Sequence, residues 1–392
     1  MAEPKITVWL SSYQHAAYLP RAIESILGQT FQDFELYAVD DCSTDGSWKI
    51  LKQYAAQDSR MHIYRHRRNL GGSHMEMLLP RLKGKYIAIA HSDDAWAPRK
   101  LERQAAYLDA HPAVDACFTA VQFIGENGCP LPDDRVHYER FRPESHTPAG
   151  WLRRLLIRGN CLCHPSVMLR REVYSLPGAL APGFYSMPDY HRWLLLAATG
   201  HQIVVLPQKL TFFRLRDHKA NMSADTPAVR SRCQAEQMFI ACTLFQRAHP
   251  TVLRQAFPEM EQWLPRCGAT RAHYTVALAR TLLQLNCAPG LQAEAARRLF
   301  CVMQRPGGAA WLRRCYGYTG ADFAADLARA DPFNTGAALV EQQLQRRLAE
   351  QTARARFDEQ ALQAMRQSNS WQLTAPLRIA KEYWNRKSGK AL

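Results

Sequence analysis

The sequence lacks the signatures of several common protein classes. It contains neither the GxGxxG pattern of nicotinamide-dependent Rossmann enzymes nor the GxxxxGK[ST] pattern of P-loop nucleotide hydrolases, so neither class is expected. Its 11 cysteines form no CxxC pair, and the nearest two, Cys161 and Cys163, lack the spacing of a zinc site. We therefore expect reduced core thiols, as in a cytosolic protein.

Long apolar runs are also missing. The longest apolar stretches, such as WLLLAATG and HQIVVLP, are well short of the ~20 residues that a membrane-spanning helix needs. The first residues, MAEPKITVWLSS, enter a strand pattern without a basic segment followed by an apolar one, so we expect no secretory signal. The prediction is a cytoplasmic protein that can also lie peripherally on the inner membrane surface.

Positive charge is in clear excess. The 50 Lys and Arg residues against 35 Asp and Glu give a formal charge of +15 over 392 residues, which favours anionic partners such as nucleic acid, acidic lipid or phosphorylated substrates. However, the basic residues are dispersed and are not interleaved with aromatic side chains as in a nucleic-acid groove. We therefore expect no nucleic acid partner. The hydrophobic content of 47% is that of a globular protein.

Strand and helix patterns alternate over residues 5–124. Apolar β-rich runs occur at KITVWLSS, FELYAVDD, MHIYRH, YIAIAH and AVDACFTAVQFI, separated by stretches with helical spacing. Such alternation is typical of βαβ units and predicts an α/β fold with a mostly parallel sheet between helices. We expect GGSHMEMLLPRLKG to be one of these helices, and HQIVVLPQKLTFFRL to form strand, turn and strand.

The pattern becomes almost wholly helical after about residue 230. We predict a catalytic domain over residues 1–230, a helical region over residues 231–335, and a helical tail over residues 336–392. The tail carries apolar residues near heptad spacing, but Gln351 and Asp358 fall at seam positions. The coiled-coil pattern is therefore weak.

Two pairs of acidic residues end predicted strands. Asp40-Asp41 closes FELYAVDD, and Asp93-Asp94 follows YIAIAHS. Ligands of open parallel sheets bind at the carboxyl ends of the strands. Mg²⁺ or Mn²⁺ bound to Asp93 and Asp94 would offset their repulsion and neutralise a diphosphate, and Asp40 and Asp41 could accept hydrogen bonds from a ribose or a base. The alternative for Asp93 and Asp94 is to cap the helix that begins near Pro98.

Two further residues are candidates with plain alternatives. Asp189 follows a proline at the start of an apolar helix, where it is either a helix cap or a general base that takes a proton from an attacking hydroxyl. Taken alone, His218 in RLRDHKANMS is more often an ordinary histidine than a ligand. Arg214 and Arg216 beside it could contact phosphates.

In their order, these stretches resemble a family-2 glycosyltransferase of the GT-A fold. The resemblance is carried by ITVWLSSYQHAAYLPRAIESILGQTFQDFELYAVDDCSTDGS, NLGGSHMEMLLPRLKGKYIAIAHSDDAW, GNCLCHPSVMLRREVY, YSMPDYHRWLLLA and FRLRDHKANMS, which together span about residues 5–225. It implies a Rossmann-like, mostly parallel sheet with flanking helices, followed by a helical C-terminal extension. It also implies inverting transfer of a hexosyl or related sugar from a nucleotide diphosphate donor to a hydroxyl.

The resemblance implies roles for the acidic strand ends. Ser11 and Tyr13 stand where the first strand meets the nucleotide. Asp41, with Asp40 beside it, matches the acidic pair that contacts the base and the ribose. The Asp93-Asp94 pair matches the Asp-x-Asp region that binds Mg²⁺ or Mn²⁺ together with the donor diphosphate.

The remaining site residues include two departures from the family pattern. Asp189 matches the catalytic base, and His218 matches the histidine of a loop that closes over the donor. His91 stands where many relatives have Asp, and we expect it to be a third metal ligand because imidazole binds Mn²⁺. Met187-Pro188 precedes the base where a glutamate is frequent.

The C-terminal stretch SNSWQLTAPLR, residues 368–378, resembles a motif at the ends of many bacterial surface-polysaccharide glycosyltransferases. The aromatic and basic residues that follow it could lie on an anionic membrane surface, and packing on the catalytic domain is the alternative. These residues are Tyr383, Trp384, Arg386, Lys387 and Lys390.

The resulting prediction is a metal-dependent glycosyltransferase of bacterial surface-polysaccharide synthesis with a glycan or lipid-linked acceptor. A metal-dependent sugar nucleotidyltransferase, which would release pyrophosphate, stays open. The third hypothesis is that the chain is a non-catalytic basic scaffold protein.

Overall fold

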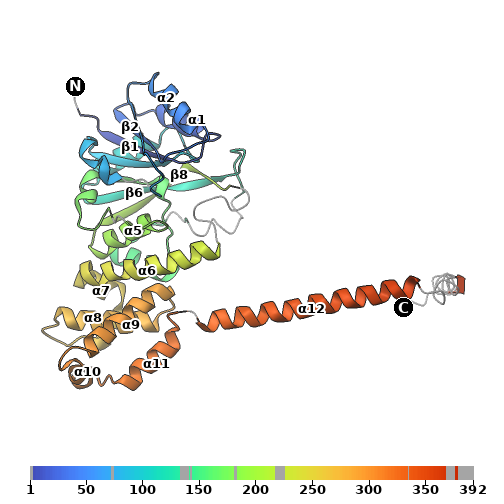
Figure 1. Cartoon of the computed structure of the whole chain (residues 1–392). Helices are drawn as coiled ribbons and strands as arrows, with labels where there is room; N and C mark the ends of the chain where they lie inside the picture. Colours follow the sequence, from blue (N-terminus) through green and yellow to red (C-terminus); the bar gives the residue numbers. More distant parts are fainter. Residues whose placement is uncertain are drawn as a thin grey trace, which may run out of the picture. The chain divides into compact units, whose positions relative to one another are not determined.

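The computed structural model describes residues 3–71, 75–132, 141, 144–180, 183–216, 226–333, 335–367 and 376–377 (Figure 1). His218 lies outside these residues, as do most of the C-terminal motif and the aromatic and basic residues after it, so the predictions for them stay predictions. The chain forms two compact units, Met1–Phe333 and Asn334–Leu392.

One mixed sheet of eight strands organises the first unit, in the order β3-β2-β1-β4-β7-β6-β8-β5. Pairing is parallel among the first four strands in this order and between β6 and β8, and antiparallel around β7 and β5. The strands are β1 (Ile6–Ser12), β2 (Phe34–Asp40), β3 (Met61–Arg65), β4 (Tyr86–His91), β5 (Ala95–Trp96), β6 (Val114–Ile124), β7 (Met168–Arg170) and β8 (Gln202–Arg214). The predicted mostly parallel sheet is confirmed.

Helices cover both faces of this sheet, which explains why its strands are apolar almost throughout. Ile6, Val8 and Leu10 of β1 pack in one core cluster, whereas Trp9 packs in a second cluster on the opposite face. The first cluster includes residues of α1 (Leu19–Leu27), α2 (Ser47–Ala55) and α3 (Lys100–Ala110). The second includes residues of α4 (Pro148–Arg158) and α5 (Pro188–Ala198).

A group of helices continues the second core cluster beyond the sheet. Buried residues of this group, such as Ile240, Leu282 and Leu299, belong to the same cluster as Trp193 of α5. The helices are α6 (Pro227–Arg247), α7 (Pro250–Ala256), α8 (Arg271–Gln284), α9 (Pro289–Met303), α10 (Gly308–Tyr316) and α11 (Gly320–Ala330). The expected helical character after residue 230 is confirmed, and the division into regions at residues 230 and 335 stays a prediction.

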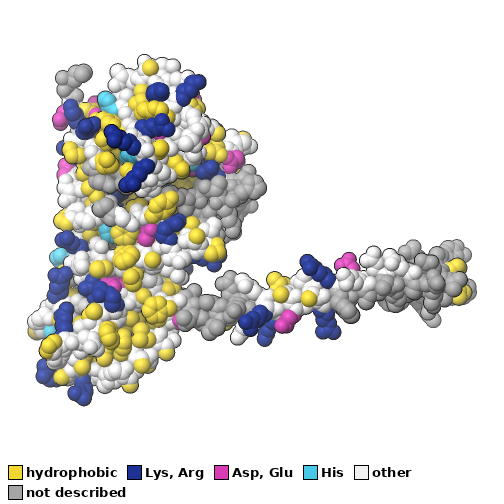
Figure 2. All heavy atoms as spheres, in the orientation of Figure 1, with side chains coloured by type: hydrophobic (Ala, Val, Ile, Leu, Met, Phe, Trp, Pro, Cys, Tyr) yellow, Lys and Arg dark blue, Asp and Glu magenta, His cyan; other side chains and the backbone are white. Residues whose placement is uncertain are grey.

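The second unit contains one long helix, α12 (Thr335–Gln367). Apolar side chains on it, including Leu344 at 59% and Leu348 at 65% exposure, face solvent. Its coiled-coil pairing stays a prediction. Across the described residues, each helix is too short or too polar to cross a membrane. On the face shown in Figure 2, Lys and Arg side chains of the first unit are spread over its upper and lower parts.

Two local predictions were wrong, and a proline lies within each. The expected helix in GGSHMEMLLPRLKG is two single 3₁₀ turns over its described residues, Met75–Met77 and Leu79–Arg81, since Pro80 disfavours continuous α-helix before it. The expected strand-turn-strand at HQIVVLPQKLTFFRL is one strand, β8. Its pairing with β6 shifts register between Leu206 and Lys209. Pro207, which has no N–H to donate, lies in this bulge, where the regular ladder of hydrogen bonds is interrupted.

Candidate active site

The carboxyl ends of β1, β2 and β4 lie side by side in the sheet. The register places Ser11 beside His91 and Ser12 beside Asp40. Because these strands are parallel, the chain leaves each of them at the same edge. The structure thus brings together most of the predicted site residues, which are Ser11, Tyr13, Asp40, Asp41, His91, Asp93 and Asp94.

Asp40, the last residue of β2, is fully buried. Its Oδ2 accepts a hydrogen bond from the N–H of Ser43 (3.0 Å) and pairs with Arg65 Nε (3.2 Å), while Oδ1 has no hydrogen-bond partner. These contacts fix the turn that follows β2. The predicted role of Asp40 in nucleotide binding stays a prediction.

Asp41 lies one residue beyond the strand and organises a second loop. Its Oδ1 accepts the N–H of Leu70 (2.8 Å) and lies 2.9 Å from Nδ1 of His66, and its Oδ2 accepts the N–H of Gly71 (3.0 Å). The carboxylate therefore holds the loop after β3 against the carboxyl end of β2. Tyr13, the residue after β1, is 43% exposed, so its ring is accessible to a ligand.

His91, Asp93 and Asp94 form a compact cluster at the end of β4. One potential ligand atom from each residue lies within 4.8 Å of the other two. The alternative that Asp93 or Asp94 caps the next helix is wrong, because α3 has Arg99 at its N-cap and no side-chain cap hydrogen bond.

The cluster fits a hard divalent cation. Asp94 is 3% exposed, and its Oδ1 accepts the N–H of Arg214 (2.8 Å), but its buried Oδ2 has no hydrogen-bond partner and lies 3.8 Å from His91 Nδ1. Burial and the Asp93 charge raise the pKa of Asp94 well above its usual value, and burial lowers the pKa of His91. Two carboxylates beside a neutral imidazole suit Mn²⁺, and the carboxylates suit Mg²⁺.

Arg214, at the end of β8, holds the Asp93-Asp94 loop from the far part of the sheet. Its Nε donates to the carbonyl oxygen of Asp93 (2.7 Å), and its Nη1 donates to the carbonyl oxygens of Gly125 (2.9 Å) and Glu126 (2.8 Å). Because these acceptors belong to two separate loops, the guanidinium ties both to the end of β8.

Two histidines that the sequence reading missed complete this edge. Nδ1 of His15 lies 2.8 Å from Ser92 Oγ, and its Nε2 lies 2.9 Å from Arg216 Nη1 and 3.9 Å from Asp93 Oδ2. His164 lies with Nδ1 3.3 Å from His91 Nε2 and its ring edge-on to the His91 ring. Both stand inside stretches that carry the resemblance, but only the fold shows their partners.

Asp189 lies in the first turn of α5, where it is not the helix cap. The N-cap is Met187, because Pro188 occupies the first helical position. Asn160 Nδ2 donates to Asp189 Oδ2 (2.8 Å) and orients the half-buried carboxylate. Burial raises the pKa of Asp189, as a general base requires, while the Asn160 hydrogen bond and the nearby Arg192 and His91 act in the opposite direction.

An open sheet with flanking helices and a paired-aspartate loop at the end of a parallel strand places this chain in the GT-A class of α/β transferases. The model of glycosyl transferase family 2 matches residues 7–175. The chain is 31% identical over 214 residues, 54% of its length and 80% of the relative's, to the putative teichuronic acid biosynthesis glycosyltransferase TuaG of Bacillus subtilis. It belongs to glycosyl transferase family 2.

The chain is also similar to two further proteins. The putative glycosyltransferase EpsE of B. subtilis is 33% identical over 174 residues, which cover 44% of this chain and 58% of EpsE. Among solved structures, S. aureus TarS residues 1–349 in complex with UDP gives a TM-score of 0.48 at 17% identity, with 85% of this chain and 92% of that chain covered.

Proposed function

We propose that this protein transfers a sugar from a nucleotide diphosphate donor to a hydroxyl group of a glycan or lipid-linked acceptor, with inversion at the anomeric carbon. The relative named for teichuronic acid biosynthesis supports a place in bacterial cell-surface polysaccharide synthesis. The observation that carries the proposal is the buried Asp94 Oδ2, which has no hydrogen-bond partner and lies 3.8 Å from His91 Nδ1. It belongs to the His91, Asp93 and Asp94 cluster at the carboxyl ends of the strands, where ligands of such sheets bind.

The donor would lie across the ends of β1, β2 and β4. Asp93, Asp94 and His91 would hold Mg²⁺ or Mn²⁺, and such an ion supplies positive charge against the donor diphosphate. The exposed Tyr13 ring and Ser11 would face the nucleoside. Asp41 would contact it beside the loop that its carboxylate already holds.

Asp189 would act on the acceptor. Its carboxylate takes the proton of the acceptor hydroxyl as that oxygen forms a bond to the anomeric carbon. The bond between the anomeric carbon and the diphosphate oxygen breaks on the opposite side, and the nucleoside diphosphate leaves with the electron pair. A single displacement of this kind inverts the anomeric configuration. Asn160, which donates to Asp189 Oδ2, orients the base.

The test is donor turnover by the full chain and by Asp189→Asn. A panel containing UDP-N-acetylglucosamine, UDP-glucose and GDP-mannose is incubated with Mn²⁺, Mg²⁺ or EDTA, and released nucleoside diphosphate is measured. We expect metal-dependent release from one donor. Asp189→Asn should lower kcat by about 10²–10⁴ with the donor Kd unchanged within about twofold, as expected when a group acts only in the transition state.

The control is Asp58→Asn, which alters another half-buried carboxylate, paired with Arg60, and should leave kcat unchanged. Full turnover by Asp189→Asn excludes it as the base. Release of pyrophosphate in place of nucleoside diphosphate identifies a nucleotidyltransferase. If calorimetry detects no metal-dependent nucleotide binding, the scaffold reading is favoured.

A further inference from the structure

The side chain of Glu236, on helix α6, is buried against the backbone that precedes the N-terminus of α5. Glu236 is 5% exposed. Its Oε1 accepts the backbone N–H groups of Tyr185 (3.0 Å) and Ser186 (2.9 Å), and its Oε2 accepts those of Ser186 (3.0 Å) and Met187 (2.7 Å). Met187 is the N-cap of α5, and Asp189 follows two residues later.

These hydrogen bonds fix the backbone that leads into α5. Three consecutive backbone amides donate to the two oxygens of one side chain, so this part of the backbone is held at several points. Arg232, one turn before Glu236 on the same face of α6, donates from Nε to Ser186 Oγ, and its guanidinium lies 4.7 Å from the centre of the Tyr185 ring. Two charged residues of α6 therefore hold the same short segment.

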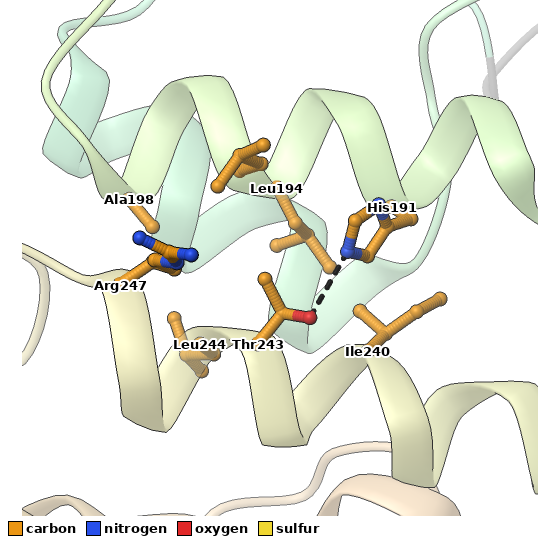
Figure 3. A pocket seen from close by; sticks show the side chains of 8 residues that line it. His191, Leu194, Ala198, Ile240, Thr243, Leu244 and Arg247 are labelled. Atoms are coloured by element: carbon orange, nitrogen blue, oxygen red, sulfur yellow. Dashed lines mark hydrogen bonds between the residues drawn. The ribbon is translucent and has the colours of Figure 1, made fainter. Parts of the chain in front are cut away.

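The contact between α5 and α6 continues beyond this segment (Figure 3). Nε2 of His191 lies 3.1 Å from Thr243 Oγ1, and Leu194 faces Leu244 across a small pocket between the two helices. His191 is 2% exposed. Because the side chains along this contact are packed, the position of α6 relative to α5 is fixed, and so is the position of Glu236 relative to the start of α5.

The same segment also reaches the nucleotide end of the sheet. A Cβ atom placed on Gly71 would lie 2.4 Å from Tyr185 Cε2, so the tyrosine ring packs directly against the Gly71 backbone. The N–H of Gly71 donates to Asp41 (3.0 Å). Residues 185–187 therefore connect α6, the loop held by Asp41, and the first turn of α5.

We infer that Glu236 is a positioning residue for Asp189. By fixing the backbone of residues 185–187, its carboxylate sets the direction of the first α5 turn and with it the place of the Asp189 side chain. This inference rests on the proposed role of Asp189. It gives the helical region after residue 230 an indirect role in the reaction, since the positioning group comes from α6 rather than from the sheet.

The test compares Glu236→Ala and Glu236→Gln with Glu294→Gln in the full chain, using the donor that the panel shows to be consumed. Glu294 is a matched control, because its buried carboxylate on α9 pairs with Arg297 and Arg298. We expect Glu236→Ala to lower kcat by about 10–100-fold, as a displacement of about 1 Å does, with donor KM unchanged within about twofold. Glu236→Gln should lose less, because its amide oxygen still accepts, and Glu294→Gln should keep the wild-type kcat.

Amide hydrogen exchange measures the positioning without any turnover. We expect exchange at residues 185–187 to be at least about tenfold faster in Glu236→Ala and unchanged in Glu294→Gln. Unchanged exchange, or a higher donor KM at constant kcat, would overturn the inference. If Asp189→Asn keeps full activity while exchange still accelerates, the proposed base is wrong but Glu236 does fix the segment. If the alanine variant does not fold, the glutamine variant decides by the same two measurements.

Discussion

Lys100 provides a quantitative test of the packing beneath the active site. It is the first residue of α3 and is fully buried. Its Nζ donates to Gln104 Oε1 (2.8 Å) and lies 4.1 Å from the centre of the Trp96 ring. Burial lowers the pKa of Lys100 from 10.5 to about 7. We predict that Lys100→Met removes a pH-dependent part of the free energy of unfolding.

The sign follows from proton binding. Between pH 7 and 10.5 the unfolded chain keeps the Lys100 proton that the folded chain has released, so stability rises with pH in this range. With these two pKa values the rise between pH 6 and pH 9 is about 2.7 kcal/mol. The Trp96 ring favours the charged amine by up to about 2 kcal/mol, which raises the folded pKa and reduces the rise to about 1 kcal/mol. The expected rise therefore lies between about 1 and 3 kcal/mol.

Urea unfolding of the wild type and of Lys100→Met at pH 6, 7.5 and 9 measures this effect. The relevant quantity is the wild-type free energy of unfolding minus that of the variant, because other titrating groups cancel in the difference. We expect this difference to increase with pH, and Lys49→Met, at an exposed position of α2, to show a constant difference from wild type. If the Lys100→Met difference is constant with pH, the buried ammonium is not where the structure places it.

Two further predictions concern the acidic strand ends. Mn²⁺ at about 100 times its Kd should stabilise the wild type by about 2.7 kcal/mol. Asp94→Asn should lose most of this stabilisation, because an amide nitrogen or a single neutral oxygen replaces the carboxylate ligand. Equal shifts of the thermal unfolding midpoint in both proteins would contradict the metal site. Arg65→Ala should lower the free energy of unfolding, measured in urea, by about 1–3 kcal/mol. The reason is that Asp40 is fully buried and Arg65 Nε lies 3.2 Å from its Oδ2. Arg65→Lys should recover part of the loss, and unchanged stability in both variants would show that Asp40 does not depend on this cation.

The parallel half of the fold was predictable because its signals are local and repeated. Apolar runs alternate there with helical patterns, and parallel pairing then forces all carboxyl ends to one edge. The exception follows β3, where the expected helix is two 3₁₀ turns over the described residues. The rest depends on distant pairing. Strand β7 has only three residues, Met168–Arg170, and lies between β6, from which α4 separates it in the chain, and β4, which comes three strands earlier. The course of β8 past Pro207 depends on the bulge in its pairing with β6.

The acidic residues of the candidate site could be named from the sequence, but the side chains and amides that contact them could not. Asp189 shows the limit. A proline-aspartate pair before an apolar run is compatible with a cap or a base. The cap is excluded only when the structure gives Met187 the cap position, and the base role stays a prediction. The hydrogen bond from Asn160 comes from a separate loop and has no signal in the sequence. Glu236 gives no signal in sequence, because a glutamate in a helix pattern is ordinary until its oxygens meet the amides that precede α5.

The two Asp-Asp pairs show why the same dipeptide carries different chemistry in one sheet. At the end of β2, the carboxylates meet protein donors, with Arg65 and a backbone amide on Asp40 and two loop amides on Asp41. At the end of β4, Asp94 receives one backbone amide on Oδ1, while its buried Oδ2 has no hydrogen-bond partner. Each pair has one buried carboxylate oxygen without a hydrogen-bond partner, Oδ1 of Asp40 and Oδ2 of Asp94. Asp40 is already paired with the Arg65 cation, so an external cation would stabilise the second pair more. The proposed metal site at the end of β4 thus rests on burial and ion pairing, which the sequence pattern alone does not contain.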